Sequence, residues 1–161
     1  MATSTQTVLI VPAITPEHIE QAQQMFLEYA ESLGFSLCFQ NFEQELKSLP
    51  GAYAPPSGRL LLAQAADGAA GCVALRTLGD GGCEMKRLYV RSAYRGKGIG
   101  VLLVDRVIAE ARAIGYHHMR LDTIASTMQP AIALYRRVGF REIPAYCANP
   151  MPEALYMELT L

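Results

Sequence analysis

The stretch that decides the fold is MKRLYVRSAYRGKGIGVLLVDRVIAEARAIGY, residues Met85–Tyr116. The part up to Val90 has the composition of a strand, and the part from Ile99 to about residue 114 has the apolar spacing of a helix that Gly115 ends. Between them lie three alternating glycines, in the sequence RGKGIG. A strand, a glycine-rich turn and a helix favour an anion site, because unpaired N–H groups at the helix start face the ligand. The stretch therefore predicts a phosphate-binding loop.

The common nucleotide-binding motifs do not fit this loop. A P-loop needs G-x-x-x-x-G-K-[ST], but Arg91 stands at the first glycine position and Gly98 follows the lysine. The dinucleotide fingerprint G-x-G-x-x-G needs a third glycine where the chain has Val101 or Leu103. A protein-kinase glycine loop lies between two strands, whereas this loop runs into an apolar helix. The phosphate therefore belongs to another class of ligand.

The rest of the chain alternates strands and helices. Strands are expected at Thr7–Ala13, Arg59–Ala66, Ala70–Leu78, Cys83–Val90, His117–Ile124, from Phe140 and at Ala154–Leu159. Helices are expected from Pro16, with Thr15 as its cap and Gly34 as its stop, and at Asn41–Leu49, Ile99–Ile114 and Gln129–Val138. This order predicts an α/β protein with a mixed sheet. A length of 161 residues without an interdomain linker favours one domain, residues 1–161.

The strand before the glycine loop changes phase along its length. Cys83 and Met85 are apolar at odd positions, whereas Leu88 and Val90 are apolar at even positions. A β-bulge between Met85 and Leu88 would bring both pairs to one face. A strand that is buried on both faces explains the pattern equally well.

One further pattern fits the loop: R-x-x-G-x-G is filled by Arg95, Gly98 and Gly100, directly after MKRLYV. This resembles the pyrophosphate loop of the GNAT superfamily of N-acetyltransferases, which bind acetyl-coenzyme A. The resemblance extends to AIALYRRVGFREI (131–143), which looks like the family's late helix and strand, and to CEMKRLYV, which looks like its fourth strand. It is strong from Arg59 onward, whereas the two N-terminal helices match only in position. It implies a single-domain GNAT-like fold with a mixed, mostly antiparallel twisted sheet of about six or seven strands, flanked by about four helices and splayed at strands 4 and 5.

The resemblance also implies where acetyl-CoA binds. Backbone N–H groups of the loop would hold the pyrophosphate, and Arg95 and Lys97 either contact phosphates or stay solvated. Backbone groups of the preceding strand would pair with the pantetheine arm, and one N–H at the splay would polarise the thioester carbonyl. The expected coenzyme residues are Leu88, Tyr89, Val90, Arg95, Gly96, Lys97, Gly98, Ile99, Gly100 and Val101.

The implied reaction is attack of a neutral amine on a thioester, so a base and an acid are needed. From its place in the resemblance, Tyr135 is the candidate general acid near the coenzyme sulfur; the alternatives are a hydrogen bond to the sulfur or core packing. Glu84 is the candidate base, acting through water, because burial in an apolar strand would raise its pKa. An ion pair with Lys86 or Arg87 is the alternative role for Glu84. If the GDGG turn before this strand is tight, Thr77 faces Glu84.

The acceptor is expected to be a small primary amine, such as an amino acid or an amino-acid-like amine, acetylated by direct sequential attack. Candidate acceptor residues are Tyr29, Phe39, Arg76, Arg87 and Tyr146, and arginines there would suit a carboxylate. Asp122 could hold Arg120 or a ligand amide, but a structural role is favoured. The proline-rich segment 144–153 either folds over the acceptor site or forms a dimer edge. The alternative functions are a protein or peptide N-acetyltransferase and a non-catalytic CoA-binding sensor module.

Composition narrows the class of partner. A net charge of −1 without blocks of like charge disfavours nucleic acid. The four cysteines form no C-x-x-C pair, so we expect no metal and no redox motif. No apolar run approaches the roughly 20 residues that cross a membrane, and the start MATSTQTVLIVPA lacks the basic segment of a signal peptide. We therefore expect a cytoplasmic enzyme, with a homodimer as one form of assembly.

Overall fold

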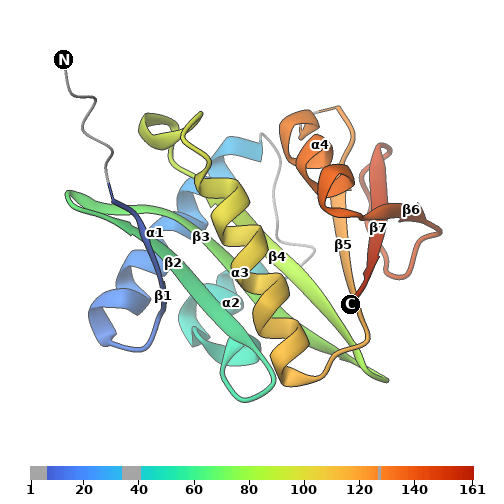
Figure 1. The fold of residues 1–161 in the computed structure, drawn as a ribbon, viewed down its shortest axis with the longest axis horizontal. Helices are drawn as coiled ribbons and strands as arrows, with labels where there is room; N and C mark the ends of the chain where they lie inside the picture. Colours follow the sequence, from blue (N-terminus) through green and yellow to red (C-terminus); the bar gives the residue numbers. More distant parts are fainter. Residues whose placement is uncertain (1–6, 34–40, 127) are drawn as a thin grey trace.

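The computed structural model describes residues 7–33, 41–126 and 128–161 (Figure 1). The elements are β1 Leu9–Pro12, α1 Pro16–Leu33, α2 Phe42–Ser48, η2 Gly51–Tyr53, β2 Arg59–Ala65, β3 Gly68–Gly79, β4 Gly82–Val90, η3 Ser92–Tyr94, α3 Ile99–Ile114, β5 His118–Ile124, α4 Gln129–Val138, β6 Arg141–Ile143 and β7 Ala154–Thr160. Within these ranges, seven strands form one sheet in the order β1-β2-β3-β4-β5-β7-β6. A mixed sheet with four α-helices confirms the predicted fold class. No helix of the described ranges is long and apolar enough to span a bilayer.

Helices cover both faces of the sheet (Figure 1). Successive residues of β2 alternate between two cores, as the two-residue period of a strand requires. Leu61 packs in the core beneath α3, and Leu62 packs on the other face with Phe26 of α1. α2 adds Phe42 to this second core. The central strands are thus buried on both faces, which explains why their sequences are nearly continuous apolar runs.

β4 contains a bulge in its second half. Two residues of β4, Arg87 and Leu88, face the single residue Val73 of β3, where the register shifts. Met85 and Leu88 therefore both pack into the core beneath α3. This confirms the predicted bulge, and burial on both faces holds as well, because Glu84 and Arg87 are buried on the opposite face.

A second register shift lies beside the β3–β4 turn, between Thr77 and Gly79. It places Arg76 opposite Glu84, whereas a tight turn followed by a regular ladder predicts Thr77 at that place. That prediction is wrong, because Leu78 is an extra residue in β3. The shift brings a guanidinium group to Glu84.

β4 and β5 run parallel and separate after a short pairing. Only Gly82–Glu84 of β4 is paired with β5, opposite His118–Arg120. From Met85 to Val90, β4 has no strand partner on its β5 side within the described chain, and the rest of β5 remains paired with β7. This is the expected splay between strands 4 and 5. It leaves a row of backbone N–H and C=O groups of β4 on the open side.

Candidate active site

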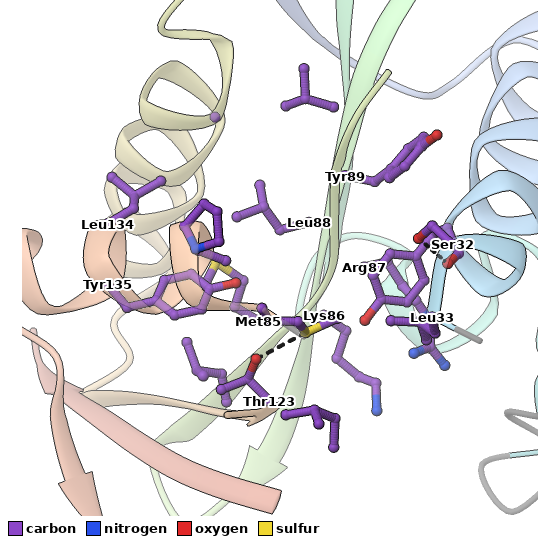
Figure 2. A pocket seen from close by; sticks show the side chains of 18 of the residues that line it. Ser32, Leu33, Met85, Lys86, Arg87, Leu88, Tyr89, Thr123, Leu134 and Tyr135 are labelled. Atoms are coloured by element: carbon purple, nitrogen blue, oxygen red, sulfur yellow. Dashed lines mark hydrogen bonds between the residues drawn. The ribbon is translucent and has the colours of Figure 1, made fainter. Parts of the chain in front are cut away.

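A cleft of about 440 Å³ opens where β4 and β5 separate. Its walls are residues 85–90 of β4 and 121–124 of β5, together with side chains from α1 and α4. Figure 2 shows β4 between the two sides, with Leu134 and Tyr135 on one side and Ser32 and Leu33 on the other. We call the side with Leu88, Val90, Gly100, Ala131, Leu134 and Tyr135 the α4 half, and the side with Tyr29, Ser32, Leu33, Lys86, Arg87 and Asp122 the α1 half.

The glycine loop reaches the α4 half at Gly100. Gly96 and Gly98 both have a φ of 78°, in the left-handed region that favours glycine. The space beside them is open, since a Cβ built at either would meet no atom of the described chain within 4 Å. α3 begins at Ile99 without a side-chain cap from the described residues, so its first N–H groups are available to an anion. The loop therefore fits a pyrophosphate.

The two cations of the loop contact nearby aromatic rings. The guanidinium of Arg95 lies 5.9 Å from the ring centre of Tyr89, and its Nε donates a 3.0 Å hydrogen bond to the Val90 carbonyl. The ammonium of Lys97 lies 5.7 Å from the ring centre of Tyr94. A carbonyl oxygen has two lone pairs, so Val90 can accept a further hydrogen bond along the open edge of β4. Leu88, Tyr89 and Val90 all line the cleft.

Tyr135 points from α4 across the cleft toward β4 (Figure 2). Its side chain is 7% exposed, and its ring packs at 5.7 Å from that of Phe140. Burial raises the pKa of Tyr135 well above its ordinary value. The hydroxyl therefore stays protonated at neutral pH, the state in which a general acid can give up a proton.

Glu84 is 1% exposed and is held by three neighbours. Arg76 Nε donates to its Oε1 at 2.7 Å, the Tyr146 hydroxyl donates to its Oε2 at 2.7 Å, and Lys86 Nζ lies 3.8 Å from Oε1. Burial acts to raise the pKa of Glu84, but Lys86, Tyr146 and Arg76 together lower it below the ordinary value. The upward pKa shift expected from burial is therefore wrong, because two cations and a hydroxyl stabilise the carboxylate.

The pairing of Glu84 predicts a pH-dependent stability. Folding lowers the pKa of Glu84, so its ion pairs stabilise the folded protein fully at pH values above 4.5, the ordinary pKa of the group. This stabilisation is lost as the pH falls through the lower pKa that Glu84 has in the folded protein. We expect Glu84→Gln to lower the free energy of unfolding by about 3 kcal/mol at pH 7, with a smaller difference from wild type below about pH 4. Urea unfolding of both proteins between pH 3 and pH 8 measures the difference. A constant gap across this range would contradict the ion-pair contribution.

The predicted acceptor residues lie in two groups. Tyr29 and Arg87 line the α1 half of the cleft, whereas Arg76 and Tyr146 meet at Glu84. Phe39 lies outside the described residues. The arginines are already paired: Arg76 with Glu84, and Arg87 with Glu45.

Asp122 lines the cleft, and among the described residues its side chain forms no hydrogen bond or ion pair with Arg120. Arg120 Nε donates to Glu158 at 2.8 Å, on the neighbouring strand β7. Asp122 instead accepts a 3.0 Å hydrogen bond from Asn149 Nδ2. Asn149 also lines the cleft, so the segment 144–153 contributes to its lining.

Lys86 lines the cleft, whereas its only predicted role was an ion pair with Glu84. Its side chain is 9% exposed and lies on the α1 half. Burial lowers the pKa of Lys86, although Glu84 acts in the opposite direction. The alternation of β4 could have revealed this residue, because Glu84 and Lys86 share a face just before the bulge.

Metal chemistry was not expected, and the described ranges contain no group of three His, Cys, Asp or Glu side chains suited to hold an ion. The arrangement found instead has an anion-binding helix start, an open strand edge and a buried tyrosine around one cleft. These features suit the binding of an acyl-coenzyme A. The chain belongs to the acetyltransferase (GNAT) family, whose model matches residues 19–140.

The chain is similar in sequence and in fold to other N-acetyltransferases. It is 41% identical over 148 residues to an uncharacterized N-acetyltransferase of Schizosaccharomyces pombe, which covers 91% of this chain and 90% of the relative. It is 47% identical over 53 residues to the L-methionine sulfoximine/L-methionine sulfone acetyltransferase of Pseudomonas aeruginosa, covering 33% and 30% of the two chains. A GNAT acetyltransferase structure from Staphylococcus aureus Mu50 superposes with a TM-score of 0.79 at 20% identity, covering 96% and 99%. The chain is an acetyl-CoA-dependent N-acetyltransferase.

Proposed function

We propose that the acceptor is the primary amine of a small metabolite that also carries a carboxylate, such as an amino acid or an amino-acid-like amine. The observation that carries this proposal is the presence of both charge signs in the α1 half, where the partly buried Lys86 and Asp122 both line the cleft. An ammonium has three donors, so Lys86 can bind a ligand carboxylate while it stays close to Glu84. The name of the Pseudomonas relative, which gives amino-acid-like acceptors, supports the same substrate class.

We place acetyl-CoA in the α4 half. The pyrophosphate would accept hydrogen bonds from the N–H groups at the start of α3, beside Gly98 and Gly100. The pantetheine arm would pair with the open edge of β4 at Leu88 and Val90, like an added strand. The coenzyme sulfur would then lie near Tyr135, which projects across the cleft toward this edge.

The proposed reaction is a direct transfer. The lone pair of the neutral amine attacks the thioester carbon, a C–N bond forms and the C–S bond breaks. The backbone N–H of Leu88 stabilises the carbonyl oxygen as it gains negative charge. Tyr135 gives its proton to the leaving thiolate, and the amine nitrogen loses a proton to water or, through water, to Glu84. The Tyr135 oxygen then regains a proton from water, which restores the acid for the next turnover. The products are an N-acetylated amine and coenzyme A.

The role of Glu84 as the final proton acceptor remains a prediction. With a lowered pKa it is ionised at neutral pH but is a weak base. The hydrogen bonds from Arg76 and Tyr146 equally suit a residue that shapes the α1 half.

A thiol-release screen with acetyl-CoA tests the acceptor class directly. The panel contains amino acids, polyamines, aminoglycosides and peptides, and we expect the highest kcat/KM for an amine with a nearby carboxylate. Turnover of peptides alone would favour a protein N-acetyltransferase. Tight binding of acetyl-CoA without thiol release for any amine would favour the sensor.

Lys86→Met tests the carboxylate subsite. We expect it to raise KM about tenfold for a carboxylate-bearing acceptor, since one charge-assisted hydrogen bond is lost, and to leave the matching decarboxylated amine nearly unchanged. Lys47→Met, on α2 and outside the cleft lining, is the control. Equal losses for both acceptors would exclude Lys86 as the carboxylate ligand.

A further inference from the structure

We infer that Arg87 is a positioning residue that fixes the β4 bulge and thereby aligns Leu88 with the thioester, and that it is not a ligand of the acceptor. This inference rests on the proposed place of acetyl-CoA beside β4. It does not depend on which amine is the acceptor. Arg87 lies where the register of β4 shifts, one residue before the cleft residue Leu88.

The backbone of Arg87 is in an unfavourable conformation for its residue type. Its φ is 61°, in the left-handed region where a side chain crowds the backbone. Such a conformation persists only when the surroundings determine it, and it is found at sites where geometry serves function. The contacts of Arg87 must therefore offset this strain.

The side chain of Arg87 is held by one carboxylate and two aromatic rings. Its Nε and Nη2 donate to the two carboxylate oxygens of Glu45 at 2.8 and 3.0 Å, a bidentate pair. The guanidinium lies 5.8 Å from the ring centre of Tyr29 and 5.4 Å from that of Phe42. The side chain is only 2% exposed. A pair with this burial and these ring contacts is costly to break for a substrate carboxylate.

The main chain of Arg87 is also anchored. The thiol of Cys72, on β3, donates to the Arg87 carbonyl at 3.3 Å. Burial raises the pKa of Cys72 well above its ordinary value, so the thiol keeps the proton that it donates. β3 thus holds the carbonyl of Arg87, and α1 and α2 hold its guanidinium.

These contacts connect the α1 half of the cleft to the reaction centre. α1 supplies Tyr29, α2 supplies Phe42 and Glu45, and all three act on the residue that precedes Leu88. Relaxation of Arg87 would turn the following peptide, because the left-handed φ sets the direction of the chain after it. Small errors in the position of an oxyanion donor are costly for turnover. The glycine loop lies outside the bulge, so its binding of the pyrophosphate is spared.

The experiment compares Arg87→Lys and Glu45→Gln with wild type and with Glu110→Gln. Glu110 is a matched control, because it pairs with Arg59 between a helix and a strand, also partly buried, and neither residue lines the cleft. Amide hydrogen exchange of residues 85–90 is measured without any acceptor. Turnover is measured with any amine, small or peptide, that the wild-type protein acetylates, and acetyl-CoA affinity by calorimetry.

Arg87→Lys and Glu45→Gln are both expected to speed amide exchange at residues 86–90 and to lower kcat about tenfold for every acceptor. The acetyl-CoA dissociation constant is expected to change less than about threefold. Glu110→Gln is expected to leave exchange at these residues and kcat unchanged. Unchanged amide exchange and unchanged kcat in both Arg87→Lys and Glu45→Gln would overturn the inference. So would a rise in KM confined to carboxylate-bearing acceptors in Arg87→Lys, which would make Arg87 a substrate ligand. Failure of the proposed acceptor class would instead appear in the wild-type screen.

Discussion

Gly98→Val is expected to raise the dissociation constant for acetyl-CoA about 100-fold, the loss of one or two hydrogen bonds to a charged group. Gly98 caps α3 with a φ of 78°, a conformation that a β-branched residue strongly disfavours. The loop would have to change its path, and the N–H groups at the helix start would no longer converge on one anion. Titration calorimetry with acetyl-CoA measures the effect.

Gly115→Val is the matched control for this substitution. Gly115 caps the other end of α3, also with a left-handed φ, of 108°, and with open space around it. It lies outside the cleft lining, so Gly115→Val should lower the melting temperature without changing acetyl-CoA affinity. If Gly98→Val binds acetyl-CoA as wild type does, the loop does not hold the pyrophosphate.

Gly100→Val separates steric filling from backbone strain. A Cβ at Gly100 would lie at an ordinary 3.7 Å from Leu134 and 3.9 Å from Val90, so the fold tolerates it. Because Gly100 lines the cleft, the added side chain would occupy space that the coenzyme needs. We expect weaker acetyl-CoA binding with a nearly unchanged melting temperature.

Tyr135→Phe is expected to lower kcat about 100-fold while the acetyl-CoA dissociation constant stays nearly the same, as for the loss of a general acid. Phenylalanine keeps the ring that packs against Phe140, so the substitution removes only the hydroxyl. Since burial raises the pKa of this hydroxyl, it should not limit the rate through its own ionisation below about pH 10. Single-turnover and steady-state rates measure chemistry and turnover separately.

Tyr116→Phe controls for the loss of a tyrosine hydroxyl. Its hydroxyl donates to the Ser57 carbonyl at 2.6 Å and lies outside the cleft lining, so kcat should be unchanged. Full activity of Tyr135→Phe would remove its role as acid and leave core packing as its function.

The sequence could predict those structural features that are determined by residues close together in the chain. The glycines between Arg95 and Val101, with a strand before them and a helix after them, indicate an anion site, because the geometry of a helix start is determined within a few residues. The change of phase along β4 indicated either a bulge or burial on both faces, and the structure has both. The register beside the hairpin turn was not predictable in this way, since the extra residue Leu78 breaks no pattern in the sequence.

The charges of the cleft required the tertiary structure. Glu84 meets Tyr146 from 62 positions away, and Arg87 meets Glu45 from 42 positions away. No local rule pairs such residues, and the sequence alone therefore suggested a raised pKa for Glu84 and a substrate role for Arg87. In the fold, Lys86 from the same strand, Tyr146 from a distant segment and Arg76 from β3 lower the pKa of Glu84. Glu45 from α2 pairs with the buried Arg87.

The sequence by itself determined the strand, the glycine loop and the helix where we propose that acetyl-CoA binds. These features depend on backbone conformation, which glycines and apolar periodicity specify locally. Only the tertiary structure decided which charged side chains line the cleft and which are paired. That depends on which ion pairs form between segments far apart in the chain, because a buried charge must find its partner wherever the fold places one.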